Sequence, residues 1–256
     1  MIEIVPIKAF SDNYIWCLRR DRHACLVDPG QAEPALDYLQ QESLTLTDIL
    51  ITHHHHDHTG GLKRLTGVFP DARVVGPHNP AVEPVHLRVA QGDAVGLTGL
   101  TAKFEVLEVP GHTLDHIAFY SLELGLFCGD TLFSAGCGRL FEGTPAQMLN
   151  SLNKLKALPD DTPVYCAHEY TRANLQFASQ VEPANADLQQ YSHWVASQRE
   201  HDRPTLPSSL ELEKAVNPFL RTHVDTVIRQ AETHQGQALA GEEQVFAAIR
   251  GWKDRF

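Results

Sequence analysis

Short runs of β-branched and aromatic residues alternate with turn residues through the first two thirds of the chain. Runs of this kind, bounded by Gly, Pro, Asn and Asp, are typical of strands. We predict strands at residues 2–7, 14–18, 24–28, 48–52, 72–76, 104–109, 116–120, 125–130 and 163–168. Apolar residues at helical spacing predict helices at residues 33–41 and 145–158 within the same part.

The pattern changes near Tyr170, where the strand signals end. Helical spacing then predicts helices over residues 174–178, 187–200 and 242–250, and the Pro- and Ser-rich segment 203–210 joins two of them. We therefore expect a strand-rich domain over residues 1–169 and a helical domain over residues 170–256.

Composition adds limits to this picture. With 256 residues, 43% of them hydrophobic and 21% charged, the chain allows one large domain or a domain with a smaller appendage. No apolar run approaches the roughly 18–20 residues that span a bilayer. The N-terminus lacks a basic segment followed by a long apolar one. We expect a cytoplasmic protein and, because no exposed apolar helix face is evident, a monomer.

The cysteines and the charge exclude further classes. The number of cysteines is odd and no C-x-x-C occurs, so buried reduced thiols are expected rather than disulfides. A formal net charge of −11 disfavours nucleic acid as a partner. The same charge disfavours a small anionic substrate unless basic residues gather locally.

One stretch, T-H-H-H-H-D-H-T-G-G, concentrates metal-binding side chains directly after the strand I-L-I-T. Side chains alternate along an extended backbone, so His53 and His55 point one way and His54 the other. Asp57 and His58 follow at the turn into a helix. The stretch thus offers two pairs of ligands, and each pair needs partners from elsewhere to complete a coordination shell.

Candidate partners stand at the ends of three other predicted strands. His112 follows a strand in E-V-P-G-H-T, Asp130 in L-F-C-G-D-T, and His168 in V-Y-C-A-H-E-Y. Functional residues of sheet proteins collect at such strand ends. Imidazole and carboxylate ligands suit zinc, iron and manganese alike.

The ordered set T-H-x-H-x-D-H, G-H-T, G-D-T and a late strand-end histidine resembles the metallo-β-lactamase superfamily. The resemblance implies an α/β fold, a four-layer αββα sandwich with a dinuclear metal site at the edge between its sheets. It implies that the first metal is held by His53, His55 and His112, the second by Asp57, His58 and His168, and that Asp130 bridges both.

The neighbouring residues receive other roles. We expect His54 to pack or hydrogen-bond beneath the site and His56 to lie beside the pocket. Asp28, in L-V-D-P-G, either orients a ligand histidine or only forms a turn. We expect Cys137, in A-G-C-G-R, to support the site and not to act as a nucleophile. An expression tag explains the pattern less well, because tags are terminal and are not interrupted by Asp in a strand-to-helix turn. A surface histidine cluster explains it less well, because the other motifs follow in order.

Longer stretches resemble the glyoxalase II, or hydroxyacylglutathione hydrolase, family. They are A-F-S-D-N-Y-I-W, G-D-T-L-F-S-A-G-C-G-R-L-F-E-G-T, A-H-E-Y-T-R-A-N-L-Q-F-A, N-P-F-L-R and the terminal R-G-W-K-D-R-F. The resemblance implies hydrolysis of the S-D-lactoylglutathione thioester to glutathione and D-lactate, the second step of methylglyoxal detoxification. It implies two divalent metal ions per chain, for which we expect zinc, with iron or manganese as alternatives.

The same resemblance places the substrate contacts, which are Arg139, Phe141, Tyr170, Asn174, Arg250 and Lys253. Some family members have Tyr where this chain has Phe141, so one hydroxyl contact to glutathione is missing here. Arg139, Arg250 and Lys253 would supply local positive charge for the anionic substrate in an otherwise acidic chain. Without the motif, Arg250 and Lys253 would be read as solvated charges on a terminal helix.

For the mechanism, we expect Asp57 and Asp130 to hold the hydroxide that the two ions share and that attacks the thioester carbonyl. A thiol has a pKa of about 8.5, so the thiolate leaves without a dedicated general acid. The main alternative is a persulfide dioxygenase on the same fold with a single iron. A nuclease and a non-catalytic binding protein fit less well, given the acidic charge and the full ligand set.

Overall fold

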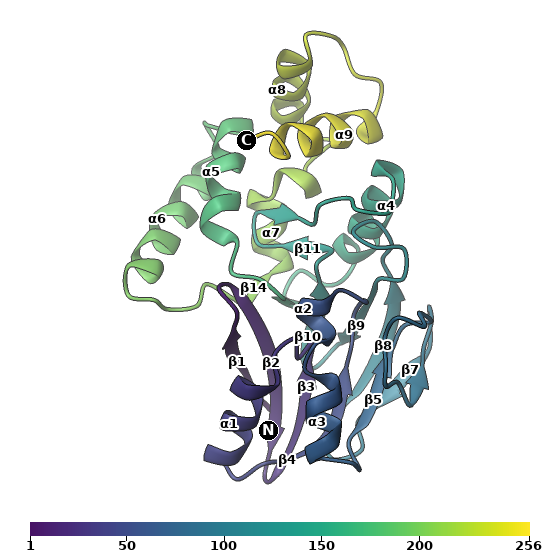
Figure 1. The fold of residues 1–256 in the computed structure, drawn as a ribbon. Helices are drawn as coiled ribbons and strands as arrows, with labels where there is room; N and C mark the ends of the chain where they lie inside the picture. Colours follow the sequence, from purple (N-terminus) through teal and green to yellow (C-terminus); the bar gives the residue numbers. More distant parts are fainter. The chain divides into compact units, whose positions relative to one another are not determined.

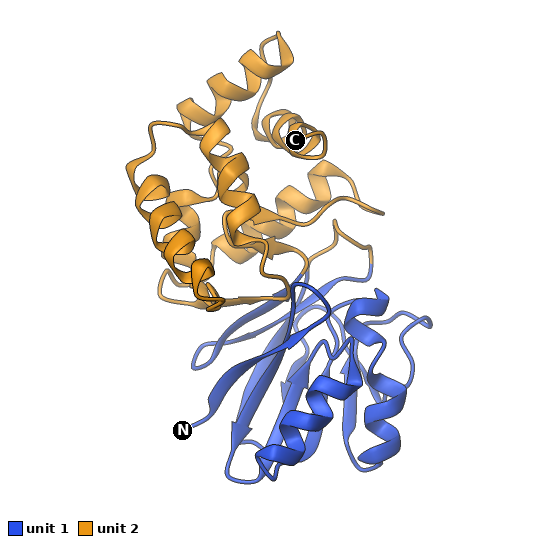
Figure 2. Cartoon of the chain, turned by 60° about the vertical axis from the view of Figure 1, so that its left-hand side comes forward, with its two compact units in different colours: residues 1–108, 115–129 blue, residues 109–114, 130–256 orange.

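The computed structural model describes residues 1–256, which form two compact units, blue and orange in Figure 2. Unit 1 contains Met1–Glu108 and Asp115–Gly129, and unit 2 contains Val109–Leu114 and Asp130–Phe256. The division at Asp130 precedes the domain boundary expected at residue 169. The reason is that segments after Asp130 pack with the C-terminal helices.

The first sheet of unit 1 has the strand order β1 to β6. Its strands are β1 (Glu3–Ala9), β2 (Asn13–Arg20), β3 (His23–Val27), β4 (Thr45–Leu50), β5 (Arg73–Gly76) and β6 (Leu87–Arg88). The pairs β1–β2 and β2–β3 are antiparallel, and the pairs from β3 to β6 are parallel. The parallel strands bring their carboxyl ends, with the residues that follow β3 and β4, to one edge of the sheet.

A second set of strands in unit 1 is antiparallel throughout. It contains β7 (Ala94–Gly96), β8 (Lys103–Glu108), β9 (Ile117–Ser121) and β10 (Gly125–Gly129). Phe104 meets Phe119 and Phe127 edge to face, with ring centroids 6.4 and 5.8 Å apart. All three rings are fully buried, so these strands pack through an aromatic core.

Two helices of unit 1, α1 (Ala32–Gln41) and α3 (Leu62–Val68), lie against the first sheet (Figure 1). Ala35 and Leu39 of α1 and Leu62 and Leu65 of α3 share one buried apolar cluster with the strands. Between them along the chain lies the short helix α2 (His56–Thr59), which carries part of the histidine stretch.

Unit 2 begins with a small hairpin of β11 (Leu132–Phe133) and β12 (Gly136–Cys137). Its other elements are α4 (Pro145–Lys156), β13 (Pro163–Cys166), α5 (Thr171–Val181), α6 (Ala186–Glu200), β14 (Ser208–Ser209), α7 (Leu210–Val216), the 3₁₀ turn η1 (Pro218–Leu220), α8 (Asp225–Gln235) and α9 (Glu242–Lys253). None of the helices combines the length and apolar character that crossing a bilayer requires.

Local sequence signals explain where several of these helices start. Thr144 caps α4 in a reciprocal capping box with Gln147, and Pro145 occupies the first helical position. Asn185 caps α6 by accepting from the Leu188 amide.

All predicted strands and helices are present, with ends shifted by a few residues. One expectation was wrong: a two-residue strand, β14, occurs after Tyr170 and pairs with β13. The sequence also did not predict β6, β7, β11, β12, α7, η1 or α8, most of which are too short to show a period.

Candidate metal centre

The histidine stretch leaves the first sheet after β4 as an extended segment and turns into α2. His53 is fully buried, and its Nε2 lies 3.1 Å from Nδ1 of His55. The two imidazole nitrogens converge, as the period-two prediction required, although the segment lies beyond the end of the strand.

The second pair, Asp57 and His58, lies in the single turn of α2. Asp57 Oδ2 is 3.4 Å from His58 Nε2, and Asn13 Nδ2 donates to the same carboxylate oxygen at 3.1 Å. A Cβ at Gly30 would stand 1.7 Å from the Asp57 carbonyl oxygen. Glycine at that position therefore lets the loop after β3 approach α2.

Asp28 connects the two pairs from beneath. It is buried, its backbone φ is +51°, and its Oδ2 lies 3.0 Å from His58 Nδ1. The Thr52 hydroxyl donates to Asp28 Oδ2 at 2.7 Å and lies 3.0 Å from His53 Nδ1. The Nδ1 atoms of His53 and His58 thus face Thr52 and Asp28. Metal-binding histidines are usually oriented by such a contact to the second ring nitrogen. A turn-forming role alone would need none of these contacts.

His54 and His56 lie outside these pairs. His54 Nδ1 is 2.9 Å from Asp115 Oδ1, and Asn79 donates to the other oxygen of Asp115 at 2.9 Å. His54 thus forms a hydrogen-bonded pair of its own, as one of its two expected roles proposed. His56 is exposed and starts α2, so it belongs to a helix and not to a loop.

Unit 2 carries a corresponding group of three side chains, His112, Asp130 and His168, all buried. Nε2 of His112 lies 3.4 Å from Asp130 Oδ2, and Nε2 of His168 lies 3.3 Å from Asp130 Oδ1. His112 Nδ1 is 2.8 Å from the Arg139 carbonyl oxygen. Because a carbonyl only accepts, Nδ1 carries the proton and Nε2 of His112 keeps its lone pair.

The donor spacings fit metal coordination in both units. Ligand atoms at about 2.0–2.2 Å from a tetrahedral ion stand about 3.4 Å from one another. The carboxylate–imidazole separations of 3.3–3.4 Å match that spacing and exceed ordinary hydrogen bonds. The pair Asp57 and His58 in unit 1, and the group His112, Asp130 and His168 in unit 2, are thus suited to divalent cations.

The predicted substrate residues all lie in unit 2 and separate into two kinds. The side chains of Arg139 (59% exposed), Phe141 and Tyr170 reach the surface. Phe141 meets His112 edge to face at 5.2 Å, and Tyr170 stacks on His168 at 4.6 Å. Phe141 and Tyr170 therefore stand beside the candidate ligands His112 and His168, and the Arg139 guanidinium lies 6.0 Å from the Phe141 ring centroid.

The others are more enclosed. Asn174 and Arg250 are buried and donate to the backbone carbonyls of Ser134 and Cys137, each at 2.9 Å. Lys253 lies over the Phe177 ring at 5.3 Å, and burial, followed by nearby Arg250, lowers the pKa of its ammonium to about 8. Without the motif, Arg250 would be expected to be a solvated charge on a terminal helix. Its burial contradicts that expectation.

Cys137 is buried, and this burial raises the pKa of its thiol, an effect that Arg250 partly opposes. Arg250 Nη1 lies 3.6 Å from the Cys137 sulfur. A protonated, buried thiol is a poor nucleophile, which agrees with the supporting role expected for it.

Sequence reasoning did not single out three residues that hold the ligand stretch. His116 stacks on His53 with ring centroids 4.5 Å apart, Asn13 binds Asp57, and Asp115 binds His54. All three lie in or beside stretches that carry the family resemblance. Asn13 lies in S-D-N-Y, and Asp115 and His116 lie in H-T-L-D-H.

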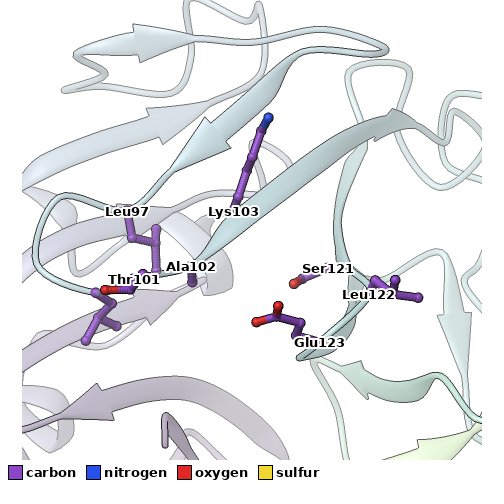
Figure 3. Close-up of a pocket in the computed structure, with 8 residues that line it drawn as sticks. Leu97, Thr101, Ala102, Lys103, Ser121, Leu122 and Glu123 are labelled. Atoms are coloured by element: carbon purple, nitrogen blue, oxygen red, sulfur yellow. The ribbon is translucent and has the colours of Figure 1, made fainter.

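A pocket of about 560 Å³ lies elsewhere in unit 1 (Figure 3). It is lined by the turns before β8 and after β9, and it contains Lys103, Ser121 and Glu123 but no histidine or cysteine. Its place is at the far end of β9 from Ile117, whose amide binds the Thr52 carbonyl beside the ligand stretch. It is therefore separate from the candidate metal ligands.

Comparisons with known proteins concern the fold and the family of the chain. Residues 10–168 match the metallo-beta-lactamase superfamily model, and residues 169–256 match the model described as hydroxyacylglutathione hydrolase C-terminus. Among solved structures, ETHE1 from Myxococcus xanthus has a TM-score of 0.66 at 26% identity, covering 99% of this chain and 98% of that one. The BLEG-1 B3 metallo-beta-lactamase has a TM-score of 0.64 at 24% identity, covering 86% of this chain and 99% of that one.

Curated relatives match at higher identity. The hydroxyacylglutathione hydrolase of Pseudomonas aeruginosa is 51% identical over 264 residues, and that of Aeromonas hydrophila is 50% identical over 257 residues. That of Nitrosomonas eutropha is 48% identical over 256 residues. Each match covers 100% of both chains. The chain therefore has the metallo-β-lactamase fold, and it belongs to the hydroxyacylglutathione hydrolase family.

Proposed function

We propose that this protein hydrolyses the thioester of S-D-lactoylglutathione to glutathione and D-lactate. The observation that carries the proposal is the presence of two groups of imidazole and carboxylate donors at coordination spacing in a full-length family member. The C-terminal family model over residues 169–256 favours the hydrolase over the persulfide dioxygenase, the alternative drawn from sequence.

We propose that the donors of both units form one centre for two zinc ions. The basis is the order of the ligand motifs in the family, together with the donor spacing inside each unit. The first ion would be held by His53, His55 and His112, the second by Asp57, His58 and His168, and Asp130 would be shared. Iron or manganese would suit the same ligands.

Bound divalent ions would lower the pKa of a water molecule toward about 7 and polarise the thioester carbonyl. The protein's own part is to fix the donors. Asp28 and the Arg139 carbonyl hold the Nδ1 protons of His58 and His112, so that each Nε2 is available for a metal. Asp57 and Asp130 would supply carboxylate charge beside the water molecule that such ions activate. The departing thiolate needs no acid, since thiols have a pKa of about 8.5.

For the substrate, we propose that Arg139 and Lys253 attract the glutathione carboxylates and that Phe141 and Tyr170 contact its body. Arg139 Nε is 3.4 Å from Asp254 Oδ1, a half-exposed contact that a substrate carboxylate could replace. Asn174 and Arg250 remain predicted substrate residues, and their burial favours action through the loop that they bind.

The test is turnover of S-D-lactoylglutathione by metal-replete protein, followed by loss of the thioester's ultraviolet absorbance. We expect saturable hydrolysis that Asp130→Ala abolishes, with a fall in metal content. Oxygen uptake with glutathione persulfide, without thioester cleavage, would instead establish the dioxygenase. Elemental analysis would identify the metals and their number.

We also propose a monomer that acts in the cytoplasm on this small-molecule substrate alone. Sedimentation equilibrium at micromolar concentration measures the first part, and a mass near twice 28.5 kDa would contradict it. Fractionation of cells that express the chain would test the second.

A further inference from the structure

The β11–β12 hairpin of unit 2 is joined to ligands at both of its ends. Asp130 lies two residues before it, and the Arg139 carbonyl, two residues after it, accepts from His112 Nδ1 at 2.8 Å. The ends also touch each other. A Cβ at Gly138 would lie 2.0 Å from the Asp130 carbonyl oxygen and 3.1 Å from His112 Nδ1. The shape of this hairpin therefore fixes where Asp130 and His112 stand relative to one another.

The hairpin cannot hold that shape by itself. It has two residue pairs, Leu132 with Cys137 and Phe133 with Gly136. A two-stranded ribbon of this size is unstable in isolation. Its turn also contains Ala135 at φ +55°, a left-handed conformation that costs free energy for any residue but glycine.

Buried side chains from the helical region bind the turn instead. Glu213 of α7 accepts from the Ala135 amide at 2.8 Å. Asn217 Nδ2 lies 3.1 Å from the Phe133 carbonyl oxygen, 2.9 Å from that of Gly136, and 3.0 Å from Glu213 Oε2. Glu213 and Asn217 are both fully buried.

Two further helices complete the set. Asn174 of α5 donates to the Ser134 carbonyl, and Arg250 of α9 donates to the Cys137 carbonyl. Polar groups from α5, α7, α9 and the residue after α7 thus bind five consecutive residues of the hairpin, from Phe133 to Cys137. These hydrogen bonds hold the backbone of the turn, although Glu213 Oε1 and Arg250 Nε are buried and form no hydrogen bond.

We infer that Glu213 and Asn217 are positioning residues for the metal ligands Asp130 and His112, acting through the backbone of the β11–β12 hairpin. The inference rests on the metal centre of the proposed function. It assigns the helical region a part in metal binding, in addition to its part in substrate binding. Neither residue needs to touch substrate or metal.

The experiment measures metal affinity in the purified full-length chain, by competition for zinc with a chromophoric chelator. We expect Glu213→Ala and Asn217→Ala to bind at least one zinc ion about tenfold or more weakly, the usual effect of removing a partner behind a metal ligand. In turnover assays kcat should fall while KM changes little. Glu213→Gln keeps an acceptor for the Ala135 amide and should restore most of the affinity.

Glu182→Ala is the matched control. Glu182 is another buried carboxylate of unit 2, but it binds Arg221 and Thr226 and has no bond to the hairpin. It should lower the thermal midpoint and leave zinc affinity unchanged. An equal loss of affinity in Glu182→Ala and Glu213→Ala would overturn the inference, because stability alone would then explain both.

If the alanine variants do not fold, Asn217→Asp tests the positioning role instead. It keeps the size of the side chain but turns a donor into a carboxylate facing two carbonyls. Folded Asn217→Asp with the zinc affinity of the unmodified chain would refute the inference. Absence of thioester hydrolysis in the unmodified chain would refute the proposed function instead, and the zinc affinities would still decide the role of the two residues.

Discussion

Asp28 is a single carboxylate in a position to orient two proposed metal ligands, His58 directly and His53 through Thr52. It accepts from the Thr52 amide and hydroxyl and lies within hydrogen-bond distance of His58 Nδ1. Asparagine has the same shape but only one accepting oxygen. We predict that Asp28→Asn lowers zinc affinity about 10–100-fold, as changes behind a metal ligand do. Chelator competition measures the affinity.

Asp48→Asn provides the comparison for Asp28→Asn. Asp48 is an equally buried carboxylate in the same sheet, but it binds Arg73 and Thr98 away from the ligands. It should lower the free energy of unfolding without changing zinc affinity. If both variants bind zinc equally well, the assigned role of Asp28 is wrong.

Lys253 gives the site a pH dependence. Burial and Arg250 lower the pKa of its ammonium to about 8, although Cys137 and Asp254 act in the other direction. Above that pH the amine is neutral and attracts a carboxylate less. We predict that KM rises as the pH passes about 8 and that in Lys253→Arg, which keeps its charge, this rise disappears. An identical rise in both proteins would exclude Lys253 as its source.

The same shift affects stability with a definite sign. The unfolded lysine has a pKa of about 10.4. Between about pH 8 and that value the unfolded chain binds more protons at Lys253, so folding is favoured as the pH rises. The titration of Lys253 therefore does not itself destabilise the fold over this range, and circular dichroism at each pH would separate a change in KM from unfolding.

At the residue level, alternation along an extended chain predicted that His53 and His55 lie together and that His54 points elsewhere. In the structure His53 Nε2 lies 3.1 Å from His55 Nδ1, while His54 Nδ1 lies 2.9 Å from Asp115. The contacts of Asn13, Asp115 and His116 were not predictable in this way, since they depend on which loops the fold brings together. The burial of Arg250 was not predictable for the same reason. Helical spacing indicates which face of α9 carries Arg250, but not that this face meets the Cys137 carbonyl.

At the level of elements, the hairpin between Asp130 and Arg139 depends on glycine. A side chain at Gly138 would collide with the Asp130 backbone, which cannot move without displacing a ligand. We predict that Gly138→Ala loses bound metal and most activity, as measured by elemental analysis and turnover. Gly67→Ala is the control, because in α3 a Cβ there meets no atom within 4 Å.

The control should move in the opposite direction. Alanine in a helix interior is more stable than glycine by roughly 0.5–1 kcal/mol, so Gly67→Ala should raise the free energy of unfolding in urea and keep its metal. Normal metal content in Gly138→Ala would show that the hairpin tolerates displacement, and this would also weaken the positioning role of Glu213.

Element prediction failed mainly for very short pieces. β11 and β12 span two residues each and contain no period, yet they connect the predicted ligand Asp130 with the predicted substrate residue Arg139. Their shape comes from side chains about 40 to 115 residues away in sequence, at Asn174, Glu213, Asn217 and Arg250. Such long-range determination leaves no local signal for a window of neighbouring residues to detect.

At the level of the whole molecule, the net charge of −11 opposes the approach of the proposed substrate, which is itself an anion. The global field repels a glutathione thioester, and the local cations Arg139 and Lys253 attract it. Added salt screens both fields, over a Debye length of about 10 Å at 0.1 M. Whether kcat/KM rises or falls with salt therefore shows which field dominates the encounter with substrate.

We predict that kcat/KM falls as sodium chloride is raised, since the cations act at contact distance and the other charges are spread over the surface. In Arg139→Gln the fall should become shallower or reverse, because the repulsive field is then less opposed. Arg229→Gln removes an exposed arginine of α8 that pairs with Asp225, and it should leave the salt slope unchanged. A slope that both variants alter equally would mean that total charge, and not the position of Arg139, controls substrate capture.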